Sequence, residues 1–417
     1  MANPLGRDRL PALKIAPKTV FDAAKVKPEM PEYATMRACV LYDAAALEVR
    51  DVPRPEAGPY DVLVQVAAVG LCGTDLHIYR GEANYNFDSN GRPVPLSSHP
   101  QILGHEITGV IQSVGAEVSG VAPGDRVVID QGLNCRSRRR HPECEYCSSG
   151  DSHQCEFYGE HGITGLQGGL AEFIAVPGVN AIRIGADLQP AQAALTEPLA
   201  CVVHSMEAAA RLTGARYHLE SGDPSRRVHA VLILGAGPAG LLFTQYLRNV
   251  LHFEGLLMVS EPSALKRKLA DHFGAETVDP SVDDLTSVVM DKTGGRLVDL
   301  MIEATGAASA YPVIASVLRK QASLLLYGHG RAGIDLSVMN GIQFKEPAII
   351  SPAGGSGGFD PDGRPSVYRR ALNLLEGGLV DVSTIVTNRY GSLDEVPGAL
   401  SRDFSDPAYI KGVVELI

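Results

Sequence analysis

The chain has 417 residues, of which 45% are hydrophobic and 20% are charged. These proportions are typical of globular proteins and exclude a disordered or fibrous chain, and the length favours two domains over one. With 37 basic and 48 acidic residues the net charge is −11, so the overall field would repel a phosphate backbone and we expect no nucleic-acid partner.

Neither a membrane span nor a targeting peptide is predicted. The longest apolar run, 230–243, is broken by three glycines and a proline and falls short of the roughly 18 residues that a membrane span requires. Residues 1–35 lack an apolar signal core and mix basic with acidic side chains, which fits neither a secretory nor a mitochondrial peptide. We therefore expect a cytoplasmic protein without a membrane partner.

The first part of the chain is predicted to be an arm followed by a β domain. Residues 1–35 carry prolines at 4, 11, 17, 28 and 31, and we interpret them as an N-terminal arm that either follows the surface or an interface or is a disordered tail. From about residue 38 to 176, short β-branched runs are separated by Gly and Pro, which predicts an antiparallel, barrel-like β region. Its expected strands include 37–42, 62–66, 110–114 and 126–129.

Beyond about residue 190 the pattern changes to alternating strands and helices, which predicts a doubly wound parallel sheet of the α/β class. The expected strands are 228–234, 256–259, 298–302, 324–327 and 348–350, and a helix is expected over 263–273. A Gly-rich loop follows residue 351, and after it come a helix over 366–376 and a strand over 410–417. This tail is too short to form a core of its own, so we expect it to complete the first domain.

A dinucleotide-binding turn is predicted where the strand ending at Leu234 runs into Gly235-Ala236-Gly237-Pro238-Ala239-Gly240. The first glycine permits the turn, the second admits a pyrophosphate to the helix N-terminus, and the third lets helix and strand approach closely. Glu261 ends the next strand about 20 residues later, where a carboxylate would accept hydrogen bonds from a ribose 2′-hydroxyl. This favours NAD over NADP, although Arg267 and Lys266 could meet a 2′-phosphate.

A second cluster consists of cysteines. Cys144 and Cys147 form a C-x-x-C pair, Cys155 follows after seven residues, and Cys135 is the obvious fourth member. Four thiolates close a tetrahedral structural zinc site, and this reading is favoured over a redox pair. His141 or His153 could take the place of Cys135.

Four further residues form the zinc-ligand set of thiolate, imidazole and carboxylate. They are Cys72, His105, Glu106 and Glu197. One thiolate and one carboxylate neutralise Zn²⁺ and leave a position open for water or an alcohol, whereas both carboxylates together would make the site anionic and a weaker Lewis acid. We therefore expect Glu106 and Glu197 to alternate or divide the work, one holding the metal and the other its bound water.

Taken together, these residues resemble the zinc-dependent medium-chain alcohol dehydrogenase family over about 37–417. The resemblance rests on Gly70-x-Cys72-Gly73-Thr74-Asp75-x-His77, Gly104-His105-Glu106, Pro123-Gly124-Asp125-Arg126-Val127, the cysteine cluster, Glu197-Pro198-Leu199 and the Gly235–Gly240 turn. Glu197-Pro198 and 259–263 look most like the polyol (sorbitol) and 2,3-butanediol dehydrogenases, with threonine dehydrogenases close by.

The resemblance implies a GroES-like β-barrel catalytic domain and a Rossmann coenzyme domain. We place the first at 36–198 and 352–417, with a zinc lobe at 135–155, and the second at 199–351. It also implies two Zn²⁺ ions per chain, catalytic and structural, and a homodimer or homotetramer. The expected activity is hydride transfer between a secondary alcohol or polyol and NAD, with an L-threonine-type or other amino-alcohol substrate as the alternative.

In this reading a substrate proton leaves through Thr74 and then His77. The alternatives without a role in proton transfer are that Thr74 is a turn residue and that His77 is an exposed helix residue. Two other functions would require different residues. A zinc-free quinone or enoyl reductase would lack the metal ligands, and a non-catalytic nucleotide-binding protein would not require Thr74 and both carboxylates.

Overall fold

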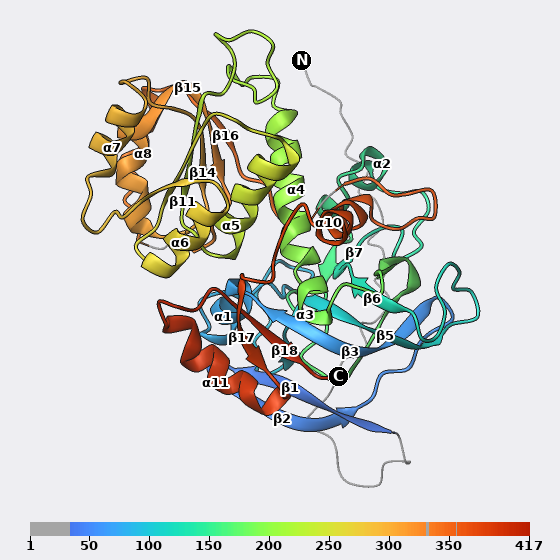
Figure 1. The fold of residues 1–417 in the computed structure, drawn as a ribbon. Helices are drawn as coiled ribbons and strands as arrows, with labels where there is room; N and C mark the ends of the chain where they lie inside the picture. Colours follow the sequence, from blue (N-terminus) through green and yellow to red (C-terminus); the bar gives the residue numbers. More distant parts are fainter. Residues whose placement is uncertain (1–33, 331–332, 356) are drawn as a thin grey trace, which may run out of the picture.

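The computed structural model describes residues 34–330, 333–355 and 357–417. They form two domains joined by a long helix, with a β-rich domain below and a mixed α/β domain above in Figure 1. Nearly all of the predicted N-terminal arm, 1–35, lies outside the described residues. The predicted α/β class, with a parallel sheet beside a barrel-like β domain, is confirmed.

The β-rich domain contains a three-stranded and a seven-stranded sheet. In the first, β1 pairs antiparallel with β2 and β4. In the second, the order is β10-β6-β5-β3-β18-β17, and β9 also pairs with β3. The strands are β1 (Thr35–Asp43), β2 (Ala46–Pro53), β3 (Asp61–Leu71), β4 (Gln101–Ile102), β5 (Glu106–Val114), β6 (Arg126–Ile129), β9 (Phe173–Pro177), β10 (Ala181–Arg183), β17 (Val386–Tyr390) and β18 (Lys411–Glu415).

The end of the chain returns to this domain. Strand β18 pairs antiparallel with β3, from Gly412 opposite Leu71 to Glu415 opposite Ala68, and β17 runs parallel to β18. Because β3 is the strand that leads to Cys72, this pairing brings the last strand beside the predicted metal ligands. The short elements of the domain are α1 (Gly73–Tyr79), β7 (Gly132–Leu133), α2 (Glu145–Ser149), β8 (Gly159–Glu160), α3 (Pro190–Ala193) and α11 (Val396–Ser401).

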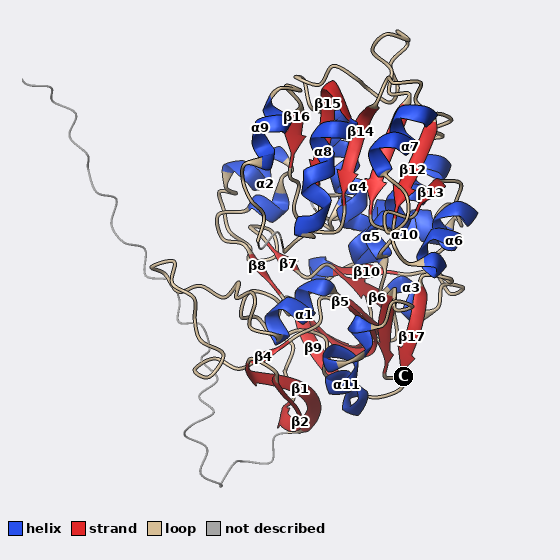
Figure 2. Ribbon diagram, turned by 90° about the vertical axis from the view of Figure 1, so that its left-hand side faces the viewer, coloured by secondary structure: helices blue, strands red, loops and turns tan. Residues whose placement is uncertain are grey.

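The α/β domain is a six-stranded parallel sheet in the order β13-β12-β11-β14-β15-β16. Helices lie on both sides of it, as Figure 2 shows. All five residues of β11 are buried, as expected for a strand of a parallel sheet that is covered on both faces. Its elements are β11 (Ala230–Leu234), α5 (Pro238–Gln245), β12 (Leu256–Ser260), α6 (Ala264–His272), β13 (Glu276–Val278), α7 (Leu285–Lys292), β14 (Val298–Glu303), α8 (Tyr311–Val317), β15 (Leu318–Leu326), α9 (Val338–Gln343) and β16 (Ala348–Ile350).

Helix α4 (Thr196–Ala210) connects the two domains. It contacts β5 of the β-rich domain, α5 of the α/β domain, and α10 (Ser366–Glu376). Its first eleven residues, through Met206, are all buried. The predicted domain boundary between 198 and 199 therefore falls within a helix, and a single hydrophobic cluster runs from Ala68 through α4 into the parallel sheet.

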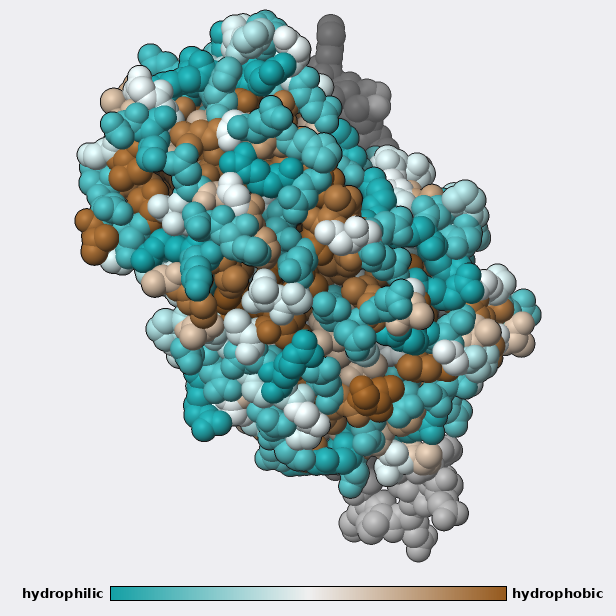
Figure 3. Space-filling model, in the orientation of Figure 1, coloured by the Kyte–Doolittle hydropathy of each residue, from teal (hydrophilic) through white to brown (hydrophobic). Residues whose placement is uncertain are grey.

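The face drawn in Figure 3 is mostly hydrophilic, and its hydrophobic residues gather on the α/β domain and where the two domains meet. Within the described part of the chain, every helix falls short of the length and apolar character needed to cross a membrane.

Candidate active site

Three predicted ligands converge where β3 ends and β5 begins. Cys72 is the N-cap of α1, directly after β3. His105 follows Gly104, whose φ of 86° is a conformation that favours glycine, and a Cβ there would lie 2.8 Å from Val69 Cγ1. Glu106 opens β5 opposite Gly70. A Cβ at Gly70 would come within 1.9 Å of Glu106 Oε2, so both glycines are needed for the approach.

The side chains of Cys72, His105 and Glu106 offer ligand atoms that all lie within 4.8 Å of one another. His105 and Glu106 are buried. Glu106 Oε2 is also buried and has no hydrogen-bond partner among the residues that the structure describes. An orphaned carboxylate oxygen beside a thiol and an imidazole fits a zinc ion, because these groups are its usual protein ligands.

The carboxylate of Asp75 lies next to the imidazole ring of His105. Asp75 is fully buried, its Oδ1 lies 3.4 Å from His105 Nδ1, and its two oxygens accept hydrogen bonds from the N–H groups of Cys72 at 2.9 Å and Gly104 at 3.0 Å. Burial raises the pKa of Asp75, but the His105 charge and these hydrogen bonds lower it below its ordinary value. The contact of Asp75 with His105 is electrostatic, because His105 Nδ1 has no hydrogen-bond partner among the described residues, and it leaves Nε2 for a metal.

Lys411, the first residue of β18, forms a buried ion pair with Glu106 Oε1. Burial lowers the pKa of Lys411, while the charges of Glu106 and Cys72 raise it, and the net direction is upward. The ammonium group therefore compensates the carboxylate charge at a place where water cannot. Because 305 positions separate the two residues, no local sequence pattern could have revealed this pair.

Glu197 lies beside this group of three ligands and is held by other contacts. It lies in the first turn of α4, and its Oε1 accepts hydrogen bonds from Gln131 Nε2 at 3.0 Å and from Cys201 Sγ at 3.3 Å. Burial, together with the charge of Glu106, raises the pKa of Glu197 to about 7, against the effect of His105. The structure thus brings Cys72, His105 and Glu106 together and places Glu197 next to them.

A buried polar network extends outward from Glu197. Gln131 Oε1 accepts a hydrogen bond from the Tyr368 hydroxyl, and Gln131 Nε2 lies 3.4 Å from Glu160 Oε1. The Tyr158 hydroxyl donates to the same Glu160 oxygen at 2.9 Å. Sequence reasoning missed this network, because its members come from four separate segments and belong to no motif. It fixes the amide of Gln131 toward Glu197.

The two residues predicted to relay a proton both lie on α1. Thr74 Oγ1 is 3.8 Å from Cys72 Sγ. His77 Nδ1 is 2.7 Å from Glu82 Oε2, and 31% of its side chain is exposed. Thr74 is therefore next to the candidate metal site, whereas His77 faces an acidic side chain near the surface.

The four predicted lobe cysteines form a second cluster. Cys135, Cys144, Cys147 and Cys155 are buried, and their sulfur atoms lie within 4.8 Å of one another. The backbone N–H groups of Cys144 and Phe157 each point at a sulfur atom, at 3.3 Å from Cys135 Sγ and Cys155 Sγ respectively. Cys135 occupies the fourth corner, so neither His141 nor His153 takes its place. The donor set fits a structural zinc ion.

The predicted nucleotide turn has the expected geometry. Gly235 has a φ of 95°, and a Cβ at Gly240 would lie 2.0 Å from the carbonyl oxygen of Gly235. By contrast a Cβ at Gly237, the N-cap of α5, would meet nothing within 4 Å. This leaves an open face at the helix N-terminus just before Pro238, where a pyrophosphate could approach the backbone.

Glu261 and Arg267 lie close to this turn. The Glu261 carboxylate accepts hydrogen bonds from the N–H groups of Ala236 and Ser263, at 2.8 and 2.9 Å. Arg267 Nη1 donates to the carbonyl oxygens of residues 261 and 262, and Arg267 Nη2 forms an ion pair with Asp279 at 2.8 Å. The guanidinium group is thus committed to protein partners.

A two-domain fold with a thiolate, imidazole and carboxylate group in one domain and a dinucleotide turn in the other defines a metal- and coenzyme-dependent oxidoreductase. The family model for the alcohol dehydrogenase GroES-like domain matches residues 58–186, and the model for zinc-binding dehydrogenases matches 238–377.

The chain is 32% identical over 367 residues to L-threonine 3-dehydrogenase of Pyrococcus abyssi, which covers 87% of this chain and 92% of that protein. It is 28% identical to the erythritol/L-threitol dehydrogenase of Mycolicibacterium smegmatis, over 85% of this chain and 91% of that protein. A putative zinc-binding dehydrogenase from Sinorhizobium meliloti, bound to NADP, superimposes with a TM-score of 0.71 at 29% identity, over 92% of this chain and 100% of that one.

The chain belongs to the zinc-dependent medium-chain alcohol dehydrogenase family. The family, the pairing of a GroES-like with a Rossmann-type domain, and the oxidoreductase class that the sequence predicted are thereby confirmed.

Proposed function

We propose that this enzyme transfers a hydride between a secondary alcohol or polyol and NAD. The observation that carries the proposal is the buried convergence of Cys72, His105 and Glu106, with Glu197 beside them. These three residues would hold a catalytic Zn²⁺, and the four lobe cysteines would hold a structural one. When bound, the catalytic zinc would supply Lewis acidity that lowers the pKa of a substrate hydroxyl.

The chain's own groups then have separate tasks. Asp75 orients the His105 ring, and Lys411 neutralises Glu106. Glu197, held by Gln131, would accept a hydrogen bond from a water molecule or a substrate hydroxyl. The Thr74 hydroxyl would take the substrate proton, and His77, which lies near the surface beside Glu82, would pass it to solvent.

The charge around the site supports an uncharged substrate. Three carboxylates, those of Glu106, Glu160 and Glu197, and one thiol surround it, while the nearby cation Lys411 is already paired. Buried acceptors of this kind suit a diol or polyol, whose hydroxyls donate hydrogen bonds. They would repel the carboxylate of an amino acid. L-Threonine remains the second candidate, because a relative that is 32% identical over 87% of this chain acts on it.

NAD is the proposed coenzyme. A ribose 2′-hydroxyl would donate to the Glu261 carboxylate, which lies beside the turn, and a 2′-phosphate there would meet a negative charge. Arg267, one of the two side chains that could have compensated that phosphate, is engaged with Asp279. Because a relative at 29% identity was solved with NADP, the activity of this enzyme must be measured with both NAD and NADP.

A homodimer or homotetramer is part of the same proposal. Strand β16 lies at the edge of the parallel sheet, and an unpaired edge can pair with another chain. Large hydrophobic side chains are exposed around it, among them Leu336, Met339 and Ile349. A cytoplasmic location, expected from the sequence, completes the proposal.

The proposal is tested by an NADH-absorbance screen on enzyme with measured zinc content. The panel should contain polyols, vicinal diols, simple secondary alcohols and L-threonine, each with NAD and with NADP. We expect turnover with a diol or polyol and NAD. Turnover of L-threonine alone would select the second candidate, and zinc-replete enzyme that oxidises no alcohol with either coenzyme would refute the function.

A further inference from the structure

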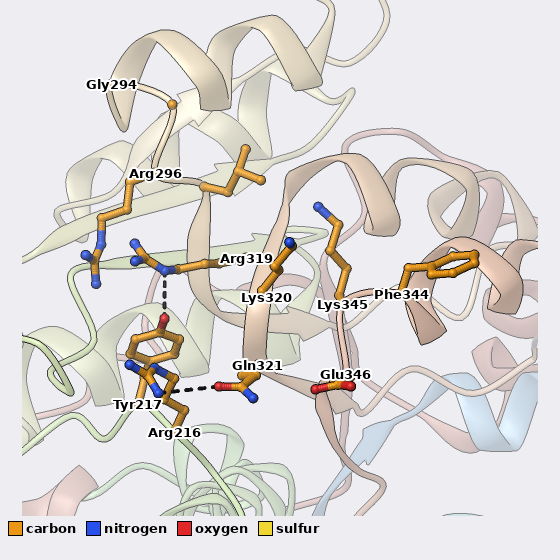
Figure 4. A pocket seen from close by; sticks show the side chains of 12 residues that line it. Arg216, Tyr217, Gly294, Arg296, Arg319, Lys320, Gln321, Phe344, Lys345 and Glu346 are labelled. Atoms are coloured by element: carbon orange, nitrogen blue, oxygen red, sulfur yellow. Dashed lines mark hydrogen bonds between the residues drawn. The ribbon is translucent and has the colours of Figure 1, made fainter.

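A pocket that is separate from the active site is basic. It has a volume of about 830 Å³ and lies where β14, β15 and β16 begin. The coenzyme turn follows the carboxyl end of β11. The pocket therefore lies at the opposite end of the strands, where they begin. Figure 4 shows its side chains gathered from four separate segments. In a chain of net charge −11, a concentration of cations of this kind requires an explanation.

Three guanidinium groups of the pocket surround one ring. The central carbons of Arg216, Arg296 and Arg319 lie 5.8, 5.8 and 5.2 Å from the ring centre of Tyr217, which is itself buried. Arg319 Nε donates to the Tyr217 hydroxyl at 2.7 Å. These contacts hold the flexible side chains against a buried ring, while 31% of the Arg296 side chain and 29% of the Arg319 side chain remain exposed.

The positive charge exceeds what the neighbouring carboxylates neutralise. Arg296 and Arg319 share the single buried carboxylate of Asp299, at 3.2 and 3.8 Å. Lys320 and Lys345 add two more cations. The backbone ties them together, because the N–H of residue 321 donates to the carbonyl oxygen of Lys345 at 2.6 Å.

Neither lysine has an ion-pair partner among the described residues. With Arg216 the pocket carries five cations, against Asp299 below it and Glu346 at its rim.

The backbone around the pocket is strained. Six non-glycine residues in the described part of the chain have positive φ, and three of them line this pocket: Leu297 at 69°, Gln321 at 60° and Glu346 at 46°. Such conformations are costly for residues with a Cβ, and they gather at functional sites more often than elsewhere. Here they shape the two loops that carry Arg296 and Lys345 and the irregular start of β15, which carries Lys320.

We propose that this pocket binds a small polyanion that contains a di- or triphosphate group. Planar guanidinium forks match phosphate oxygens in pairs, and lysine ammonium groups add point charges at the rim. The pocket is large enough for such a group, and its five cations match several negative charges better than one. The same chemistry is offered by inorganic polyphosphate and by a nucleotide, whose base would find the exposed ring of Phe344 at the rim.

The test measures binding of sodium tripolyphosphate, and separately of ATP, by calorimetry on zinc-replete enzyme saturated with NADH. Saturation keeps the probes out of the coenzyme site. The double variant Lys320→Gln/Lys345→Gln should bind the probes at least about tenfold more weakly, because it removes two ammonium groups that would contact phosphate oxygens. The double variant Arg50→Gln/Arg402→Gln removes the same charge from exposed positions of the other domain and should bind as the wild type does.

The arms of the experiment separate the outcomes. Equal affinity for both probes assigns the site to the phosphate group, and tighter binding of ATP assigns it to a nucleotide. The proposal is overturned if neither probe shows saturable binding to the wild type, or if the two double variants bind them equally. Because NADH turnover is measured separately, failure here leaves the proposed dehydrogenase activity untouched.

Discussion

Lys411 and Glu106 form an ion pair in which both side chains are almost completely buried, at 3% and 0% exposure. One residue begins the last strand of the chain and the other begins β5, and β3 lies between these two strands. The pair therefore joins the returning C-terminal segment to a candidate zinc ligand. Lys411 balances the charge of Glu106 whenever the metal is absent. The same ion pair therefore affects both the stability of the fold and its affinity for zinc.

Removing the cation should expose this link. In zinc-depleted enzyme, Lys411→Met leaves Glu106 buried and uncompensated, so we expect the free energy of unfolding to fall by about 3 kcal/mol or more. In zinc-replete enzyme the loss should be smaller, because the metal compensates the carboxylate. Urea unfolding of both forms measures the two differences.

A double-mutant cycle provides the control. Lys411→Met/Glu106→Gln removes both charges, and we expect it to recover part of the lost stability, with a coupling of about 1–3 kcal/mol. Strictly additive losses, or an equal loss with and without zinc, would contradict a compensating role for Lys411.

The two carboxylates should respond differently to neutralisation. Glu106 Oε2 is unpartnered within the described structure and lies in the tight group with Cys72 and His105, so Glu106→Gln should lower the zinc content of the enzyme. Glu197 is held by Gln131 and Cys201, so Glu197→Gln should retain zinc and lower kcat by about tenfold or more, as for loss of a positioned proton acceptor or hydrogen-bond acceptor. Metal analysis and turnover, measured on the same samples, decide the matter, and a reversed pattern would make Glu197 the resting ligand.

Sequence reasoning predicted the convergence of Cys72, His105 and Glu106, because each lies in a short contiguous pattern whose chemistry is readable. The turn glycines were equally accessible, since Gly235 and Gly240 occupy positions that a larger side chain cannot. Asp75 was within reach, because a carboxylate three residues after the N-cap Cys72 is a helix-capping position. Lys411 and Gln131 were not, because their roles depend on strand pairing and on packing between distant segments, which no local periodicity encodes.

The cysteine lobe should lose its metal independently of the active site. Cys147→Ser removes one of four converging sulfur atoms, and we expect the zinc content to drop by about one ion per chain, with lower thermal stability. Cys39 is a buried cysteine that belongs to neither cluster, so Cys39→Ala should retain all the zinc. Unchanged zinc in the Cys147 variant would refute the structural site.

Coenzyme choice should depend on Glu261. Glu261→Ser removes the carboxylate beside the Gly-rich turn, so we expect kcat/KM for NAD to fall by about tenfold or more, in line with loss of hydrogen bonds to a charged group. The value for NADP should rise, because the repulsion of the 2′-phosphate is gone. Arg267→Gln, which disrupts the ion pair with Asp279, should not by itself improve NADP. A wild-type enzyme that already prefers NADP would contradict the assignment.

Asp130 should make the stability of the fold depend on pH. This side chain is buried and accepts a hydrogen bond from the N–H of Gly132 at 2.9 Å. Burial raises its pKa from 3.8 to about 8, with the charges of Glu160 and Glu197 adding to the effect.

In the unfolded chain Asp130 ionises near its ordinary value, while in the fold it keeps its proton. Its contribution to stability is therefore complete below 3.8 and is lost progressively as the pH rises towards 8. Asp130→Asn keeps the acceptor oxygen for Gly132 and cannot ionise. Near pH 8 the free energy of unfolding of Asp130→Asn should therefore exceed that of the wild type by on the order of a few kcal/mol. This difference should shrink at about pH 5. Urea unfolding of zinc-replete enzyme across this range measures it, with the exposed Asp271→Asn as control. Parallel pH profiles for wild type and Asp130→Asn would show that the carboxyl group is ionised in the folded protein.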